Sequence, residues 1–173
     1  MIMPKGQQLL LPVNPVFIAA SLVAALALNM LPLGRVVWTP DWVMVLLVFW
    51  GMHQPQRVGL GVAFLMGLCL DVYQSALLGQ HALVYCLLMF GAQYTHRRLL
   101  WFGPLLQALQ LLPLFFVAHA LELLLRVAIG GGILPGFEGL VAPLLEAALW
   151  PLASWVLLAP QRRPPDRDEN RPL

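Results

Sequence analysis

The chain has 173 residues, of which 60% are hydrophobic and only 10% are charged, and its formal net charge is +2. Soluble domains carry about 25% charged residues, so this composition excludes an ordinary soluble protein and indicates an integral membrane protein. The basic residues are scattered and form no patch for nucleic acid, so we expect no nucleic-acid partner. We predict one membrane domain over residues 1–160 and a disordered cytoplasmic tail over residues 161–173, which is rich in Arg, Pro and acids.

Six apolar runs bounded by proline, glycine or charge predict helices. In chain order they cover residues 13–33, 40–53, 57–73, 78–94, 104–129 and 140–159. The second run has 14 residues, which at about 1.5 Å each cover less than the hydrocarbon core of about 30 Å. We therefore predict an all-α, polytopic membrane protein with six transmembrane helices, or five if the second run does not cross.

Helix-start signals favour a crossing by the second run. Thr39 offers a capping hydroxyl, Pro40 suits the first helical position, and Asp41 complements the positive end of the helix dipole. Tryptophans near both ends, among them Trp42 and Trp50, are expected to anchor the helix at the membrane interfaces. These features predict a short transmembrane helix.

The distribution of Lys and Arg predicts which side each end faces. With six spans and the N-terminus inside, only Arg35 and Arg126 of the ten basic residues lie outside, as the positive-inside rule requires. Five spans with the N-terminus outside give the same eight-to-two division, so the rule does not choose between the two arrangements. Both arrangements place the C-terminus in the cytoplasm.

Asp71 is the one acid in a long apolar run that contains several glycines. A charge in hydrocarbon costs about 2.5–3.5 kcal/mol on insertion scales, so this side chain should face protein, water or a partner. It ends a ridge of small residues at successive i+4 positions: Gly59, Ala63, Gly67 and Asp71. Because small residues let helices approach closely in a membrane, we predict that this ridge is a helix-packing or partner interface. The alternative is that Asp71 reaches interfacial water.

Other polar side chains within apolar runs predict a second feature. Gln80 and His81 begin the next helix, within reach of Asp71 across the connection of residues 74–79. Glu146 lies inside the last helix, where burial and interfacial exposure remain equally open. Together Asp71, Gln80, His81 and Glu146 form a candidate polar pocket.

The fifth predicted helix carries His119, Glu122 and Arg126 on one face. Glu122 and Arg126 stand at i and i+4 in the favourable order for an ion pair. A metal site would need matching ligands from another helix, and the sequence contains no second HxxE or ExxH. We therefore predict an intrahelical ion pair and no bound metal.

Catalytic motifs are absent from the sequence, which has no GxSxG, HExxH, P-loop or CxxC. We predict no catalytic residue, no cofactor and no enzymatic activity. A lipid-modifying enzyme would need an acid–base pair at headgroup depth, and His81 with Asp71 is the single candidate for it.

Residues 40–83 resemble the MreD family of rod shape-determining proteins of Gram-negative bacteria. The matching features are Pro40 and Asp41, Trp50, the turn at 55–57, the stretch 67–71 and the segment 78–83. Over the rest of the chain the resemblance is one of size and number of spans.

The resemblance implies a non-enzymatic inner-membrane scaffold of the cell-elongation machinery, which builds peptidoglycan in rod-shaped cells. It implies binding to MreC through membrane-embedded helices, with RodA, a class B penicillin-binding transpeptidase and the cytoskeletal MreB in the wider complex. The family is also similar in architecture to the substrate-binding subunits of energy-coupling factor transporters. The alternative function is therefore that of a vitamin-type transporter subunit, which would need a polar, ligand-sized pocket.

Overall fold

The computed structural model describes residues 13–31, 39–128 and 140–161, and the regular structure in these ranges is entirely helical. The helices are α1 Pro15–Asn29, α2 Trp42–His53, α3 Leu60–Gln74, α4 Gln80–Leu99, α5 Pro104–Ala128 and α6 Val141–Leu158, followed by a 3-10 turn, η2 Ala159–Gln161. The prediction of an all-α protein is confirmed. Lys5, Arg35 and the part of the predicted tail beyond Gln161 lie outside the described residues.

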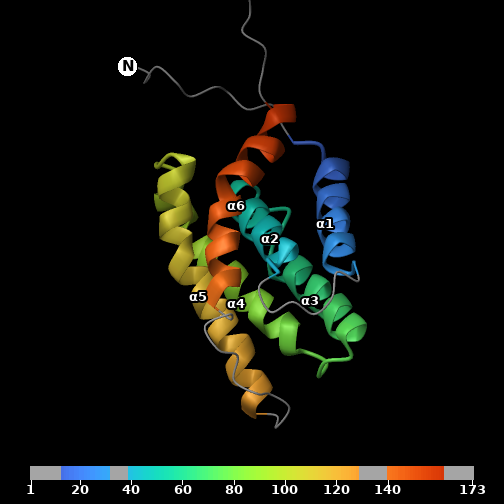
Figure 1. Ribbon diagram of the computed structural model, residues 1–173. Helices are drawn as coiled ribbons and strands as arrows, with labels where there is room; N and C mark the ends of the chain where they lie inside the picture. Colours follow the sequence, from blue (N-terminus) through green and yellow to red (C-terminus); the bar gives the residue numbers. More distant parts are fainter. Residues whose placement is uncertain (1–12, 32–38, 129–139, 162–173) are drawn as a thin grey trace, which may run out of the picture.

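Successive helices run in alternate directions through one bundle (Figure 1). The end of α1 meets the start of α2, where Asn29 Nδ2 donates to Asp41 Oδ1 at 2.6 Å. At the opposite end the α2–α3 turn returns to the start of α1, where Arg57 Nη1 donates to the carbonyl of Val13 at 2.8 Å. Helix α2 contacts α1, α4 and α6, while α4 contacts α2, α3 and α5.

Helix α2 is short and lies in the interior. Nine of its 12 residues are buried, so neighbouring helices cover most of its surface. Asp41 caps it, since Oδ1 accepts from the N–H groups of Val43 at 2.9 Å and Met44 at 3.1 Å. The predicted start at Thr39 and Pro40 is wrong by two residues, because the Asp41 carboxylate takes up the first free N–H groups.

Trp50 is fully buried. Its indole Nε1 donates to Ser21 Oγ at 2.9 Å, and its ring packs edge-on against Phe17 and Phe49. The prediction that Trp50 anchors the helix at an interface is wrong, because α1 supplies a hydroxyl for the indole and apolar surroundings for the ring.

Within residues 13–31, 39–128 and 140–161, two helices are long and apolar enough by themselves to cross a membrane, judged by length and composition: Pro104–Ala128 and Val141–Gln161. Helices α1, α2 and α3 are also apolar but shorter. Large apolar side chains stand exposed on the outer faces, for example Phe64 on α3, Phe90 on α4 and Leu109 on α5. Such a surface suits hydrocarbon better than water, so the structure is that of a helical membrane-type protein.

Candidate functional site

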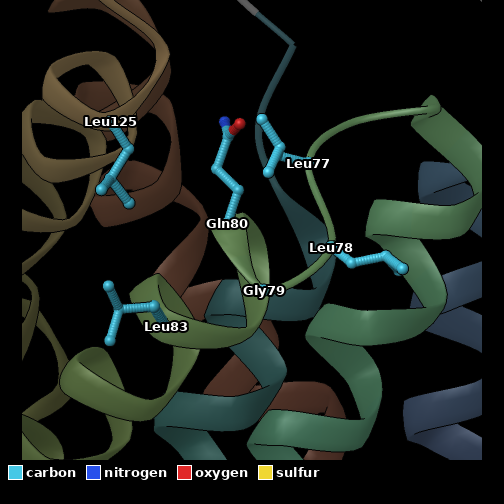
Figure 2. A pocket seen from close by; sticks show the side chains of 6 residues that line it. All are labelled: Leu77, Leu78, Gly79, Gln80, Leu83 and Leu125. Atoms are coloured by element: carbon cyan, nitrogen blue, oxygen red, sulfur yellow. The ribbon is translucent and has the colours of Figure 1, made fainter. Parts of the chain in front are cut away.

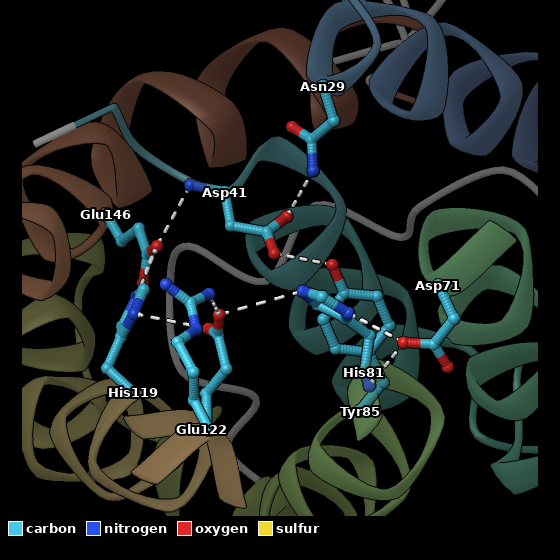
Figure 3. Close-up of polar contacts among 9 residues, drawn as sticks. Asn29, Asp41, Asp71, His81, Tyr85, His119, Glu122 and Glu146 are labelled. Atoms are coloured by element: carbon cyan, nitrogen blue, oxygen red, sulfur yellow. Dashed lines mark hydrogen bonds and ion pairs between the residues drawn. The ribbon is translucent and has the colours of Figure 1, made fainter. Parts of the chain in front are cut away.

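A layer of polar side chains lies inside the bundle, near the end where α1 and α3 finish and α2, α4 and α6 begin (Figure 3). Every helix contributes through hydrogen bonds or ion pairs, α2 by its capping residue. We call these nine residues the polar network: Asn29, Asp41, Asp71, His81, Tyr85, His119, Glu122, Arg126 and Glu146.

Asp71 joins α3 to the start of α4. It is fully buried. Its Oδ2 accepts from the backbone N–H of Gly79 at 2.8 Å, and its Oδ1 accepts from the backbone N–H and the Nδ1–H of His81 at 2.8 and 2.7 Å. The connection between the helices places these donors through left-handed backbone at Ser75, φ 51°, and Gly79, φ 101°. Asp71 therefore closes the α3–α4 hairpin, with His81 as its partner.

Gly67 brings α3 and α4 into close contact. A Cβ atom on Gly67 would lie 2.3 Å from Ala82 Cα and 2.7 Å from the carbonyl carbon of His81. Ala63 is also fully buried, whereas Gly59 is partly exposed. Three of the four ridge residues therefore pack inside the bundle, and Gly59 lies at its margin.

Asp41 connects four helices. Its Oδ1 accepts from Asn29 on α1, and its Oδ2 accepts from the Tyr85 hydroxyl on α4 at 2.5 Å. Its backbone N–H donates to Glu146 Oε1 on α6 at 3.0 Å. Asn29 Oδ1 in turn accepts from the N–H of Trp42 at 3.0 Å. The first turn of α2 is thus fixed to helices on several sides.

Glu146 joins α6 to α5 and to the start of α2. Its side chain is fully buried. Of the two alternatives that the sequence left open, burial and interfacial exposure, the structure shows burial. Oε1 accepts from His119 Nε2 at 2.8 Å as well as from the Asp41 N–H. Oε2 is buried and has no hydrogen-bond partner among the described residues.

Glu122 lies between His81 and His119 and so connects the two parts of the polar network that contain them. Its Oε1 lies 2.7 Å from Arg126 Nη2 and 3.7 Å from His81 Nε2, and its Oε2 lies 3.9 Å from His119 Nδ1. The predicted pair of Glu122 and Arg126 is confirmed. Within the described residues, no group of three or more potential ligands is arranged to hold a metal ion.

The structure places three residues of the candidate polar pocket, Asp71, His81 and Glu146, in the polar network, and the fourth, Gln80, beside a hollow. A small hollow of about 180 Å³ opens at the α3–α4 connection and is lined by Leu77, Leu78, Gly79, Gln80, Leu83 and Leu125 (Figure 2). Gln80 is its one polar side chain. Asp71, His81 and Glu146 instead pair with other members of the polar network.

Sequence reasoning missed Tyr85 and treated Asp41 only as a helix-start residue. Tyr85 stands one turn beyond His81, so a hydroxyl on the same face of α4 was a usable signal. The role of Asp41 had no such signal, because its partners Tyr85 and Glu146 are 44 and 105 positions away. The paired charges of the polar network can fix helices relative to one another. None of its nine residues is an activated nucleophile.

Comparison with known proteins extends the match well beyond residues 40–83. The family model of rod shape-determining protein MreD matches residues 7–157. A similar relative is the rod shape-determining protein MreD of Haemophilus influenzae (strain ATCC 51907 / DSM 11121 / KW20 / Rd), 28% identical over 131 residues. The alignment covers 73% of this chain and 76% of the relative. No solved structure matches.

Proposed function

The chain belongs to the MreD family of rod shape-determining proteins, and we propose that it acts as a non-enzymatic scaffold in the inner membrane. In this proposal the folded bundle holds other members of the rod-shape machinery in place and carries out no chemistry itself. MreC is the direct partner. RodA, a class B penicillin-binding transpeptidase and MreB belong to the wider complex.

One observation carries the scaffold proposal: the polar network joins all six described helices by hydrogen bonds and ion pairs between its own members. The carboxylate oxygens of Asp71 accept hydrogen bonds from Gly79 and His81. Those of Asp41 accept from Asn29, Tyr85 and the first turn of α2. Polar side chains committed in this way fix the relative positions of helices in a membrane. The apolar outer faces then remain as the surface for partners and lipid.

We propose six transmembrane passes with both chain ends in the cytoplasm. The alternating direction of the helices supports this arrangement, because α2 carries the chain back to the end of the bundle where α1 began. Helix α2 spans only about 18 Å at about 1.5 Å for each of its 12 residues. Its burial among α1, α4 and α6 supports a short pass, because protein rather than lipid surrounds it.

The outer face of α3 is the proposed contact for MreC. Gly67 faces α4, so the opposite side of α3 points outward and carries Leu65 and Val72, which are 60% and 70% exposed. A transmembrane helix of MreC would pack against such a face by van der Waals contact.

Photo-crosslinking in native membranes tests this proposal. A crosslinking amino acid at Leu65 should capture MreC, whereas the same residue at Leu109, 66% exposed on α5, serves as the matched lipid-facing control. Capture of MreC from neither position, with the chain folded in the membrane, would refute direct binding through α3.

For the vitamin-transporter alternative, the hollow at Gln80 is lined mostly by leucine, which suits a polar vitamin poorly. Thermal unfolding of the purified chain with a panel of vitamins checks it directly. Saturable stabilisation by one vitamin would overturn the scaffold proposal.

A further inference from the structure

Charged side chains in the described ranges are separated between the two ends of the bundle. The four acids there, Asp41, Asp71, Glu122 and Glu146, all belong to the polar network at one end. Arg126 is at that same end and is paired with Glu122. The opposite end carries the remaining described arginines and no described acid.

Three arginines lie at this opposite end. Arg97 and Arg98 stand exposed in the last turn of α4, and Arg57 stands exposed in the α2–α3 turn. Gln93 ties the two regions together, because its Nε2 donates to the carbonyl of Val58 at 3.2 Å. Among the described residues, none of the three arginines has a carboxylate within ion-pair distance. No carboxylate in the described part of the chain therefore neutralises their positive charge.

Aromatic and aliphatic side chains stand beside these arginines. Trp101, in the turn between α4 and α5, is 88% exposed, and Tyr94, one turn before Arg98, is 82% exposed. Leu105, in the first turn of α5, is 77% exposed. Tryptophan and tyrosine concentrate where hydrocarbon meets lipid headgroups, because each has an apolar body and a polar group.

We propose that the α4–α5 turn binds the headgroups of anionic phospholipids. The site consists of Arg97, Arg98, Trp101 and Tyr94, with Arg57 nearby; we call it the cationic turn. The arginines supply positive charge at phosphate depth, and the aromatic rings and Leu105 enter the boundary of the acyl chains.

A lipid fits the cationic turn better than an acidic protein segment does. An acidic peptide would satisfy the arginines but would leave Trp101 and Leu105 without an apolar partner. A phospholipid offers phosphate and hydrocarbon in one molecule, so it can contact both the arginines and the apolar groups. This inference does not depend on MreC binding, so failure of one proposal leaves the other standing.

Native mass spectrometry of the full chain in neutral detergent tests the assignment. The chain is titrated with phosphatidylglycerol and, separately, with phosphatidylcholine. We expect preferential retention of phosphatidylglycerol, and the Arg97→Gln/Arg98→Gln variant should retain it about tenfold less well. Trp101→Ala should weaken retention of both lipids, because it removes the apolar contact.

The charge-conserving variant Arg97→Lys/Arg98→Lys is the matched control and should keep most of the preference. Its melting temperature and that of Arg97→Gln/Arg98→Gln should equal the melting temperature of the unchanged chain, since both side chains are exposed. Equal retention of the two lipids, or an undiminished preference in Arg97→Gln/Arg98→Gln, would overturn the proposal. Binding of a glutamate-rich peptide with no lipid preference would assign the turn to an acidic protein partner and would overturn it as well.

Discussion

Tyr85 donates one short hydrogen bond that fixes α4 to the start of α2. Its hydroxyl lies 2.5 Å from Asp41 Oδ2, and its side chain is fully buried. Tyr85→Phe would leave that carboxylate oxygen without its donor, so we expect a loss of about 1–3 kcal/mol in the free energy of unfolding. Denaturant unfolding of the purified chain in mixed micelles measures this loss.

Tyr94→Phe is the matched control, since Tyr94 is on the same helix and 82% exposed. Its effect should stay within about 0.5 kcal/mol. Equal effects of the two substitutions would show that the Tyr85–Asp41 bond contributes no specific stability.

His119 and Glu146 couple α5 to α6 across a distance of 2.8 Å. His119→Leu and Glu146→Gln should each destabilise the bundle, and the double variant should lose less than the two single losses added together. We expect a coupling free energy of about 0.5–3 kcal/mol from the double-mutant cycle. Strictly additive losses would contradict a direct interaction.

Residue pairs close in sequence were predictable, and distant ones were not. Spacing alone indicated Glu122 with Arg126, and the short connection indicated Gln80 or His81 as a partner for Asp71, of which His81 is the one observed. The contact of Asp41 with Glu146 joins residues 105 positions apart, and no local pattern encodes it. Trp50 was placed at an interface because tryptophan favours both interfaces and well-packed interiors, and only the neighbour Ser21 decides between them.

At the scale of helices, the α3–α4 pair depends on Gly67. In Gly67→Ala the new Cβ would meet Ala82 Cα at 2.3 Å, which is backbone and has little freedom to move. We expect a loss of about 1–3 kcal/mol or more as the two helices separate. Gly67→Leu should have a larger effect and should also weaken capture of MreC, because the α3 face would be displaced.

Gly61→Ala provides the comparison on the same helix, since a Cβ there would meet no atom within 4 Å. This change should leave stability unchanged or raise it slightly, because alanine favours helix. Melting temperatures of the two variants, measured side by side, check the prediction. Equal melting temperatures for Gly67→Ala and Gly61→Ala would contradict the close approach of α3 and α4.

The apolar runs predicted where helices form. They did not predict which helix faces meet protein and which meet lipid. In a membrane protein, faces that meet lipid and faces that meet protein are both apolar, so hydrophobic periodicity does not distinguish them. The burial of α2 on most of its surface therefore needed the three-dimensional arrangement. The start of α2 was misplaced for a local reason, because Thr39 and Asp41 are both good caps.

For the whole molecule, the alternating helices predict that the two chain ends face the same compartment. A reporter fused to the N-terminus and one fused to the C-terminus should both read as cytoplasmic. A periplasmic N-terminal reporter would instead support five passes and would require α2 to enter and leave on one side.

If this chain maintains rod shape as an assembled membrane scaffold, cell shape should depend on its folded bundle when it replaces the native copy. In its own host, depleted of the native protein, the unchanged chain and Gly61→Ala should restore rods of normal width. Gly67→Ala should give rounded cells with less MreC retained on the purified chain. Rounded cells with the unchanged chain folded in the membrane, or normal rods with an unfolded Gly67 variant, would contradict the claim.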